Sequence, residues 1–271
     1  MLDISTMELA TIELTQPEPG IVVATLNRPE RMNAQTFQMF DDLAALPLLL
    51  RDEDELRALI ITGAGRAFCA GFDLAEIDRL TELGVREFLK FQELATGALA
   101  AIRGLPVPVI AAVNGAAAGG GMALALCADI RLAAPEARIN AAFVKVGLSV
   151  GELGTSWQLT RLVGPGRAAE MAFTGRPVGA EEAERIGLVN RVVPAESLLD
   201  EAIALARAVC SNSPGGVRLS KRALQANQEV SSYAAALELE NRGQALLTRG
   251  SDMPEALAAF KEKREPVFTG R

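Results

Sequence analysis

Two short glycine-containing segments could present backbone N–H groups to an oxyanion. Gly119, Gly120 and Gly121 stand before an apolar segment with helical spacing, residues 122–127, and a second turn at residues 70–74 contains Gly71. The first N–H groups of a helix have no partner inside it, and the helix dipole adds partial positive charge there. Two such donors, one from each segment, could stabilise the charge on a thioester carbonyl that becomes an enolate. The alternative is a close-packed Ala/Gly-rich helix that binds nothing.

The elements that precede these segments should bring them together. Apolar runs rich in β-branched residues predict buried strands at residues 56–62 and 107–113, one before each segment. Parallel strands place their C-terminal ends at the same edge of a sheet, which is where ligands usually bind. We therefore expect both segments to lie at that edge.

The rest of the chain alternates strands with helices. Further strands are predicted at residues 21–26, 129–133 and 188–193, and helices at residues 85–102, 155–163 and 180–185. Asn33 is expected to cap a helix that runs through residues 37–46. This alternation predicts an α/β core with mainly parallel pairing. From residue 195 the pattern is helical almost to the end, which divides the chain into a core, residues 1–194, and a helical C-terminal region, residues 195–271.

Composition excludes several kinds of chemistry. The chain has 271 residues, of which 49 % are hydrophobic, and it contains no histidine. Without histidine there can be no Ser-His-Asp triad, no Cys-His nucleophile and no His-based metal site. The three cysteines form no CxxC pair, so we expect no metal site and a reducing compartment. No signal peptide or membrane span is apparent, and these features together favour a cytoplasmic protein.

Net charge also limits the partners. Formal net charge is −7 at neutral pH. Because non-specific nucleic-acid binding needs a cationic surface, this charge argues against DNA or RNA as the ligand.

Several motifs taken together make the sequence resemble the crotonase family, the enoyl-CoA hydratases and isomerases. The resemblance covers nearly the whole chain, and the order and spacing of the motifs are more specific than any one of them. The matching residues are Leu26-Asn27-Arg28-Pro29 with Asn33-Ala34; Phe68 with Ala70-Gly71-Phe72-Asp73-Leu74; Asn114-Gly115 with Gly119-Gly120-Gly121; Cys127-Ala128-Asp129; Thr174-Gly175-Arg176; Ala183 with Gly187-Leu188-Val189; and Ala259-Phe260 with Glu262-Lys263-Arg264.

This resemblance implies a spiral of ββα turns, a helical C-terminal trimerisation region, and usually a hexamer built from two trimers. It implies that the backbone N–H groups of Phe72 and Gly120 form an oxyanion hole. Near the adenine and phosphates of CoA it places Phe260 and Lys263 of a neighbouring subunit, although Lys263 could also be an ordinary solvated charge. The residues implied to line the remainder of the CoA moiety are Arg28, Ala70, Asp73 and Leu74.

The chain departs from the family at its two best-known acidic positions. Hydratases of this family use two glutamates, and the corresponding residues here are Ala123 and Phe143. A carboxylate pair that activates water is therefore missing. With these residues, Met122 and Trp157 are expected to line the acyl pocket, and the bulk of Phe143 favours an unusual acyl shape.

Glu152 is the one acid left in a suitable place. Its position resembles that of the acid in some enoyl-CoA and dienoyl-CoA isomerases of the family, and its neighbours Val150, Leu153 and Trp157 are apolar. Desolvation among such residues would raise the pKa of the carboxyl and suit it to move a proton. The alternative is an N-cap or first-turn acid that stabilises the helix beginning at Thr155.

These observations predict an enzyme that stabilises a thioester enolate and isomerises an enoyl-CoA double bond, with Glu152 as the single acid and base. The alternatives are a hydratase that uses Glu152 and one water, and a relative that binds acyl-CoA without chemistry. We expect no cofactor, because CoA would be part of the substrate. The expected partners are an acyl-CoA thioester and further copies of the chain, with no nucleic acid and no membrane.

Overall fold

A computed structural model describes Ile4 and residues 7–270 of the chain. Its core contains a six-stranded sheet and a four-stranded sheet. In spatial order the larger sheet holds β1 (Ile12–Glu18), β2 (Ile21–Leu26), β3 (Ala58–Gly63), β5 (Val109–Val113), β7 (Ile130–Ala133) and β10 (Arg191–Val192). Only β1 pairs antiparallel with its neighbour in this sheet.

The smaller sheet receives one strand from each successive turn of the chain. It holds β4 (Ala67–Cys69), β6 (Ala116–Ala118), β8 (Arg138–Asn140) and β9 (Val178–Gly179). Since β4 follows β3, β6 follows β5 and β8 follows β7, the chain passes repeatedly from the large sheet to the small one. This is the spiral that the family resemblance implies.

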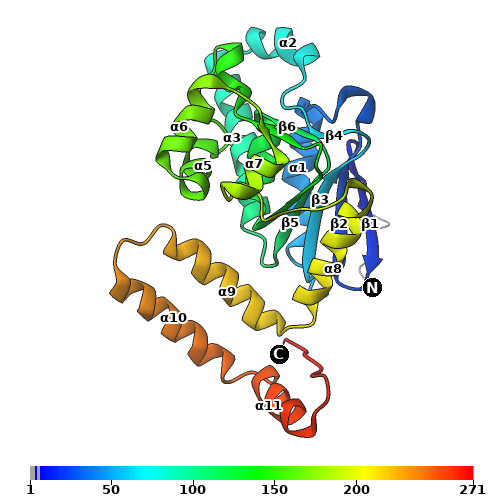
Figure 1. Ribbon diagram of the computed structural model, residues 1–271, viewed down its shortest axis with the longest axis vertical. Coiled ribbons are helices and arrows are strands. Elements are labelled where there is room, and N and C mark those ends of the chain that lie inside the picture. Colours follow the sequence, from blue (N-terminus) through cyan, green and yellow to red (C-terminus); the bar gives the residue numbers. More distant parts are fainter. Residues whose placement is uncertain (1–3, 5–6, 271) are drawn as a thin grey trace.

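Helices cover both faces of the large sheet (Figure 1). On one side α1 (Phe37–Leu50), α3 (Val85–Arg103) and α4 (Gly120–Cys127) join the main core. On the other side α8 (Leu198–Cys210) packs Leu198, Ala202 and Ala206 against β2, β3 and β5. The remaining core helices are α2 (Ile77–Glu82), α5 (Thr155–Val163), α6 (Pro165–Thr174) and α7 (Ala180–Arg185).

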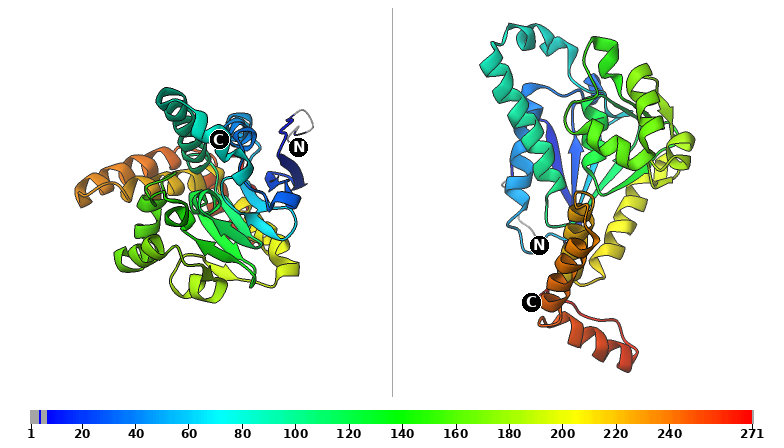
Figure 2. Two further views of the ribbon diagram at one scale, coloured as in Figure 1. Left: turned by 90° about the horizontal axis from the view of Figure 1, so that it is seen from above. Right: turned by 90° about the vertical axis from the view of Figure 1, so that its left-hand side faces the viewer.

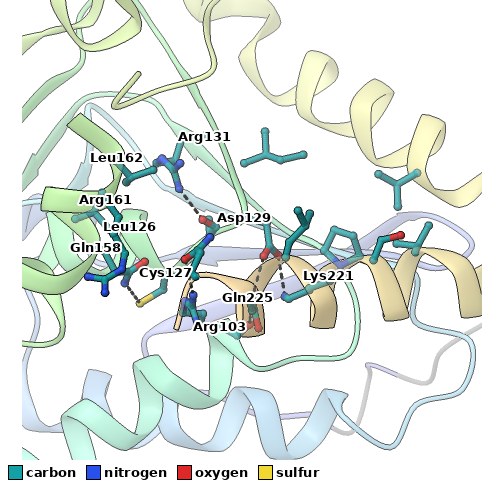
Figure 3. Close-up of a pocket in the computed structure, with 18 of the residues that line it drawn as sticks. Arg103, Leu126, Cys127, Asp129, Arg131, Gln158, Arg161, Leu162, Lys221 and Gln225 are labelled. Carbon is teal, nitrogen blue, oxygen red and sulfur yellow. Dashed lines mark hydrogen bonds and ion pairs between the residues drawn. The ribbon is translucent and has the colours of Figure 1, made fainter. Parts of the chain in front are cut away.

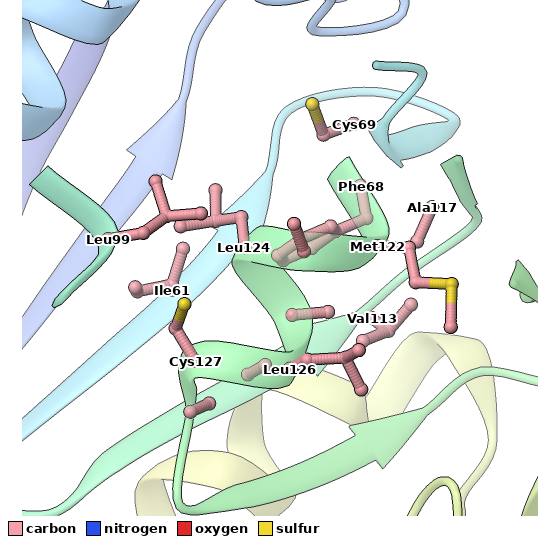
Figure 4. Packing of buried hydrophobic residues seen from close by; sticks show 14 of the residues in the cluster. Ile61, Phe68, Cys69, Leu99, Val113, Ala117, Met122, Leu124, Leu126 and Cys127 are labelled. Atoms are coloured by element: carbon pink, nitrogen blue, oxygen red, sulfur yellow. The ribbon is translucent and has the colours of Figure 1, made fainter. Parts of the chain in front are cut away.

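Helix α4 lies at the centre of this packing. All its residues are buried, and Figure 4 shows Met122, Leu124 and Leu126 among side chains from the sheet and from α3. Strands β3 and β5 are likewise buried along their whole length. Parallel strands covered on both faces are continuously apolar, which is why the sequence predicted them.

An arm of three helices leaves the core. Figures 1 and 2 show α9 (Pro214–Asn227), α10 (Tyr233–Leu247) and α11 (Asp252–Glu262) extending away from the sheets. Helical structure after residue 195 was predicted, but α8 packs on the sheet, so the part that leaves the core begins at α9. None of the described helices is long and apolar enough to cross a membrane.

The expected cap of α1 was wrong. Thr36 is the N-cap, and its hydroxyl accepts from the N–H of Met39 at 3.2 Å. Asn33 instead donates to the carbonyl oxygens of Ala64 and Ala67, at 2.9 and 2.8 Å. Its amide therefore braces the loop between β3 and β4 rather than the helix.

Candidate active site

The two glycine segments lie side by side, as expected from the sheet topology. A Cβ at Gly71 would lie 2.8 Å from the carbonyl oxygen of Ala118 and 3.7 Å from the nitrogen of Gly120. Gly71 also has a φ of +95°, which L side chains rarely adopt. Close approach and backbone conformation thus both require glycine here.

Both of the expected donors are free to bind a ligand. The N–H groups of Phe72 and Gly120 donate no hydrogen bond within residues 4 and 7–270. Gly120 is also the first residue of α4, where the helix dipole favours negative charge. Two unpaired donors on adjacent loops can together bind one carbonyl or enolate oxygen.

An aromatic cluster holds the turn that contains Phe72. The Phe72 ring lies 5.9 Å from that of Phe37 on α1 and 6.2 Å from that of Phe91 on α3, measured between ring centroids. Phe91 in turn contacts Phe37 and Phe40, with centroids 4.5 and 5.3 Å apart. Packing of the side chain therefore restrains the backbone N–H. This cluster could not be identified from the sequence, because its members come from three separate segments.

Glu152 lies in the loop before α5, half-buried. Burial raises the pKa of its carboxyl, and the side chain of Gln92 on α3 lowers it in part. The next residue, Leu153, places its Cδ1 3.4 Å from where a Cβ would stand on Gly120. The acid therefore belongs to the loop that contacts one of the two donors.

The helix-capping alternative for Glu152 does not describe the structure. Gly154 occupies the N-cap of α5, and no side chain caps that helix. Leu153 and Gly154 both have positive φ, 50° and 76°. A non-glycine residue in this region is strained, and such strain is found preferentially at functional sites.

The four residues expected to form an acyl pocket have different surroundings. Met122 and Ala123 are fully buried inside α4. The ring of Phe143 lies beside the glycines, with Cε1 3.7 Å from a Cβ position on Gly119. Trp157 lies on α5 with Arg161 over its ring at 3.8 Å. With Leu153, Thr96 and Leu99 among others, it lines a cavity of about 280 Å³.

The residues expected to bind CoA also differ in their surroundings. Arg28 donates to the buried carboxylate of Asp73 at 2.9 Å and to the carbonyl of Ala34. The N–H of Ala70 donates to the carbonyl oxygen of Met32 at 3.0 Å. The side chain of Leu74 is 72 % exposed.

The two residues expected from a neighbouring subunit lie on the arm. Phe260 on α11 is 84 % exposed, and Lys263 follows the same helix as its C-cap. Figure 1 shows α11 far from the glycine segments. Within one chain these residues do not approach the site, so only a second chain could bring them to it.

Another cavity, of about 970 Å³, lies between α9 and the core. Its lining includes Asp129, directly before β7, and Cys127, the last residue of α4, at the end of that helix away from the glycines. Figure 3 shows Lys221 of α9 beside Asp129 in this cavity. Arg131 also lines it, and burial lowers the pKa of this guanidinium to about 10. No group of three or more acidic, Cys or His side chains among the described residues could hold a metal.

Comparison with known proteins identifies the family. A sequence model of the enoyl-CoA hydratase/isomerase family matches residues 16–271. The chain belongs to the enoyl-CoA hydratase/isomerase family and has the crotonase fold, which confirms the expectation from the sequence.

Relatives and solved structures agree with this assignment. The chain is 42 % identical to "Probable enoyl-CoA hydratase EchA12" of Mycobacterium tuberculosis, over 98 % of this chain and 94 % of the relative. It is 38 % identical to the 1,2-epoxyphenylacetyl-CoA isomerase of Escherichia coli, over 95 % and 98 %. A crystal structure of enoyl-CoA hydratase from Bacillus anthracis superposes with a TM-score of 0.91 at 34 % identity, over 96 % of this chain and 100 % of the other.

Proposed function

We propose that this chain isomerises the double bond of an enoyl-CoA, with Glu152 as its only acid and base. One observation carries the proposal: a half-buried carboxyl of raised pKa lies in the loop whose next residue, Leu153, contacts Gly120. Ala123 and Phe143 stand at the positions where the family resemblance places the two glutamates of hydratases. An allylic proton shift needs one group that first accepts and then returns a proton. Addition of water needs that water to be positioned and activated as well.

The proposed reaction proceeds through a dienolate. The carboxylate of Glu152 takes a proton from C2 of a 3-enoyl thioester, and the electron pair moves into the carbonyl. The resulting oxygen accepts hydrogen bonds from the N–H groups of Phe72 and Gly120, which are unpaired without a ligand. Glu152 then returns the proton to C4, and the double bond moves from C3–C4 to C2–C3. Atoms balance without any cofactor beyond the CoA of the substrate.

Hydration by Glu152 and one water is the second candidate. It is favoured by the name of the 42 % identical M. tuberculosis relative, whereas the E. coli relative is named an isomerase. Non-catalytic binding of acyl-CoA is the third. The half-buried position of the Glu152 carboxyl and the strain next to it favour chemistry over simple binding.

Product analysis separates these candidates. The protein is incubated with a 3-enoyl-CoA, and the products are resolved by chromatography and mass spectrometry. We expect a product of unchanged mass with its double bond at C2, lost with Glu152→Gln and retained with Glu93→Gln, an exposed acid on α3. A product heavier by one water would support hydration, and a bound but unchanged substrate would support the binder.

We also propose that the chain forms a trimer or a dimer of trimers. Large apolar side chains are exposed along the arm, including Tyr233, Leu246, Leu257 and Phe260. Packing of these side chains against another copy would remove them from water and could bring Phe260 and Lys263 to a neighbouring CoA site. Light scattering of the purified protein tests this, and a monomer would contradict it.

A further inference from the structure

We propose that Gln35 is a positioning residue for the oxyanion hole, because it binds both of the loops that supply the donors. The inference rests on the function proposed above. Gln35 lies between Ala34 and the N-cap of α1, and it is 0 % exposed.

The main chain of Gln35 orients the first donor. Its N–H donates to the carbonyl oxygen of Gly71 at 2.7 Å, and its own carbonyl accepts from the N–H of Asp73 at 2.8 Å. The carbonyl of Gly71 and the N–H of Phe72 belong to one planar trans peptide group. A hydrogen bond to that oxygen therefore fixes the direction of the Phe72 N–H on the opposite side, and it polarises the same group.

The side chain of Gln35 holds the second donor residue. Its Nε2 donates to the carbonyl oxygen of Gly120 at 3.2 Å. Its Oε1 lies only 2.0 Å from where a Cβ would stand on Gly120. The amide thus contacts Gly120 at the carbonyl and at the α-carbon, which restrains the start of α4. One residue thereby fixes the spacing between the two N–H groups.

Stability alone does not explain an amide at this position. Oε1 of Gln35 is buried and has no hydrogen-bond partner among the described residues. A buried, unpaired acceptor destabilises a fold, and an apolar side chain of similar volume would avoid that cost. A polar residue that lowers stability and contacts a donor loop is typical of a functional position.

The test substitutes Gln35→Met, which conserves volume and removes only the amide. The probe is hexanoyl-CoA carrying ¹³C at the thioester carbonyl, a saturated ester that lacks the double bond to be moved. Isotope-edited infrared spectroscopy measures how far binding lowers the carbonyl stretching frequency. Calorimetric titration gives the Kd of the same ligand, and a melting curve gives Tm.

We expect the variant to bind hexanoyl-CoA with nearly the wild-type Kd, to melt at the wild-type temperature or above, and to lower the carbonyl frequency less. With a 3-enoyl-CoA, kcat should fall about tenfold while KM changes little, since alignment of the donors matters most in the transition state. Gln38→Met is the matched control, because Gln38 is exposed and its amide binds Asp42 instead. A second variant, Gln35→Leu, should repeat the result.

Two failures are distinguishable. If wild-type protein leaves the carbonyl frequency of the probe unchanged, the oxyanion hole itself is wrong and the proposed function fails with it. If wild type lowers the frequency and both Gln35 variants lower it equally, with unchanged kcat, the oxyanion hole stands and the role of Gln35 is overturned. If a Gln35 variant has a lower Tm than wild type but lowers the carbonyl frequency of the bound probe as far as wild type does, Gln35 has only a structural role.

Discussion

The guanidinium of Arg28 lies 2.9 Å from the carboxylate of Asp73, the residue that follows Phe72, whose N–H is a proposed oxyanion donor. Arg31 lies 3.0 Å from the other oxygen of the same carboxylate, whose side chain is 4 % exposed. Both residues of the 2.9 Å pair were expected to line CoA. The pairing gives them a structural role, because it fixes the turn that presents the Phe72 N–H.

Asp73→Asn should destabilise the protein by about 3 kcal/mol at neutral pH, because it leaves two guanidinium groups without their buried anion. Burial alone would raise the pKa of Asp73. The hydrogen bonds that its carboxylate accepts from Arg31, the Ala75 N–H and Arg28 outweigh this effect and lower the pKa to about 2. Urea unfolding followed by circular dichroism measures the loss. Asp52→Asn, in an exposed pair with Arg51, is the control and should change stability by less than about 0.5 kcal/mol.

The same ion pairs predict a pH dependence of stability. Because the folded pKa lies below the unfolded value of about 3.9, the contribution of Asp73 is complete above that value and disappears as pH falls through about 2. The stability difference between wild type and Asp73→Asn should therefore shrink across this interval. A difference that is constant from neutral pH to pH 2 would contradict the low pKa.

Gln92→Leu should move the acidic limb of the pH–rate profile to higher pH. Gln92 lowers the pKa of Glu152, which burial raises, so its removal should raise that pKa further. The proposed reaction requires the carboxylate form of Glu152, so kcat/KM should rise with pH through the pKa of this group. Kinetics across pH test this, with Glu93→Gln as the control on the same helix. An unchanged limb would show that another group sets it.

Gly121→Ala should destabilise the core by about 3 kcal/mol or more, or prevent folding. A Cβ there would lie 2.0 Å from the carbonyl oxygen of Cys69, which belongs to the backbone of β4 and cannot move aside easily. Gly166→Ala on α6, where a Cβ meets nothing within 4 Å, should be neutral or slightly stabilising. Melting temperatures of both variants provide the comparison, and equal values would contradict this account of the close approach.

Lys221→Met should loosen the arm. The buried Nζ of Lys221 lies 2.8 Å from both the carbonyl of Val107 and the carboxylate of Asp129, and so attaches α9 to the core. Loss of the two contacts of this amine should lower the free energy of unfolding by about 2 kcal/mol and expose the connection between α8 and α9. Limited proteolysis at residues 211–213 should become faster, but not with Lys261→Met on α11. Identical cleavage rates would show that other contacts hold α9.

Much of the core could be predicted because its strands are buried on both faces. The runs that became β2, β3 and β5 are apolar except for Thr25 and Thr62, and α5 and α7 were predicted with their observed ends. The smaller sheet was missed, since strands of two or three residues such as β4 and β9 have no detectable periodicity. Strand β1 was also missed, because its apolar/polar alternation covers only Ile12 to Thr15 before Gln16 and Pro17 interrupt it.

The candidate site was predictable where backbone and spacing decide it. Gly71 and Gly120 indicated two adjacent loops, and the close approach of those loops explains why both positions are glycine. Gln35 and Gln92 were not identified, because their partners lie 85 and 60 positions away in the sequence. Only the fold shows that one amide reaches Gly120 and the other affects the carboxyl of Glu152.

Incorporation of deuterium tests the central claim most directly. The protein is incubated with a 3-enoyl-CoA in D₂O, and the acyl group is analysed by mass spectrometry. We predict deuterium at the acyl carbons with wild type, because the half-buried carboxyl of Glu152 can exchange its proton with D₂O before donating to C4, and none with Glu152→Gln. The melting temperature of the variant should not be lowered, because a carboxyl with a raised pKa destabilises the fold at neutral pH. Exchange at the wild-type rate by Glu152→Gln would show that another group moves the proton.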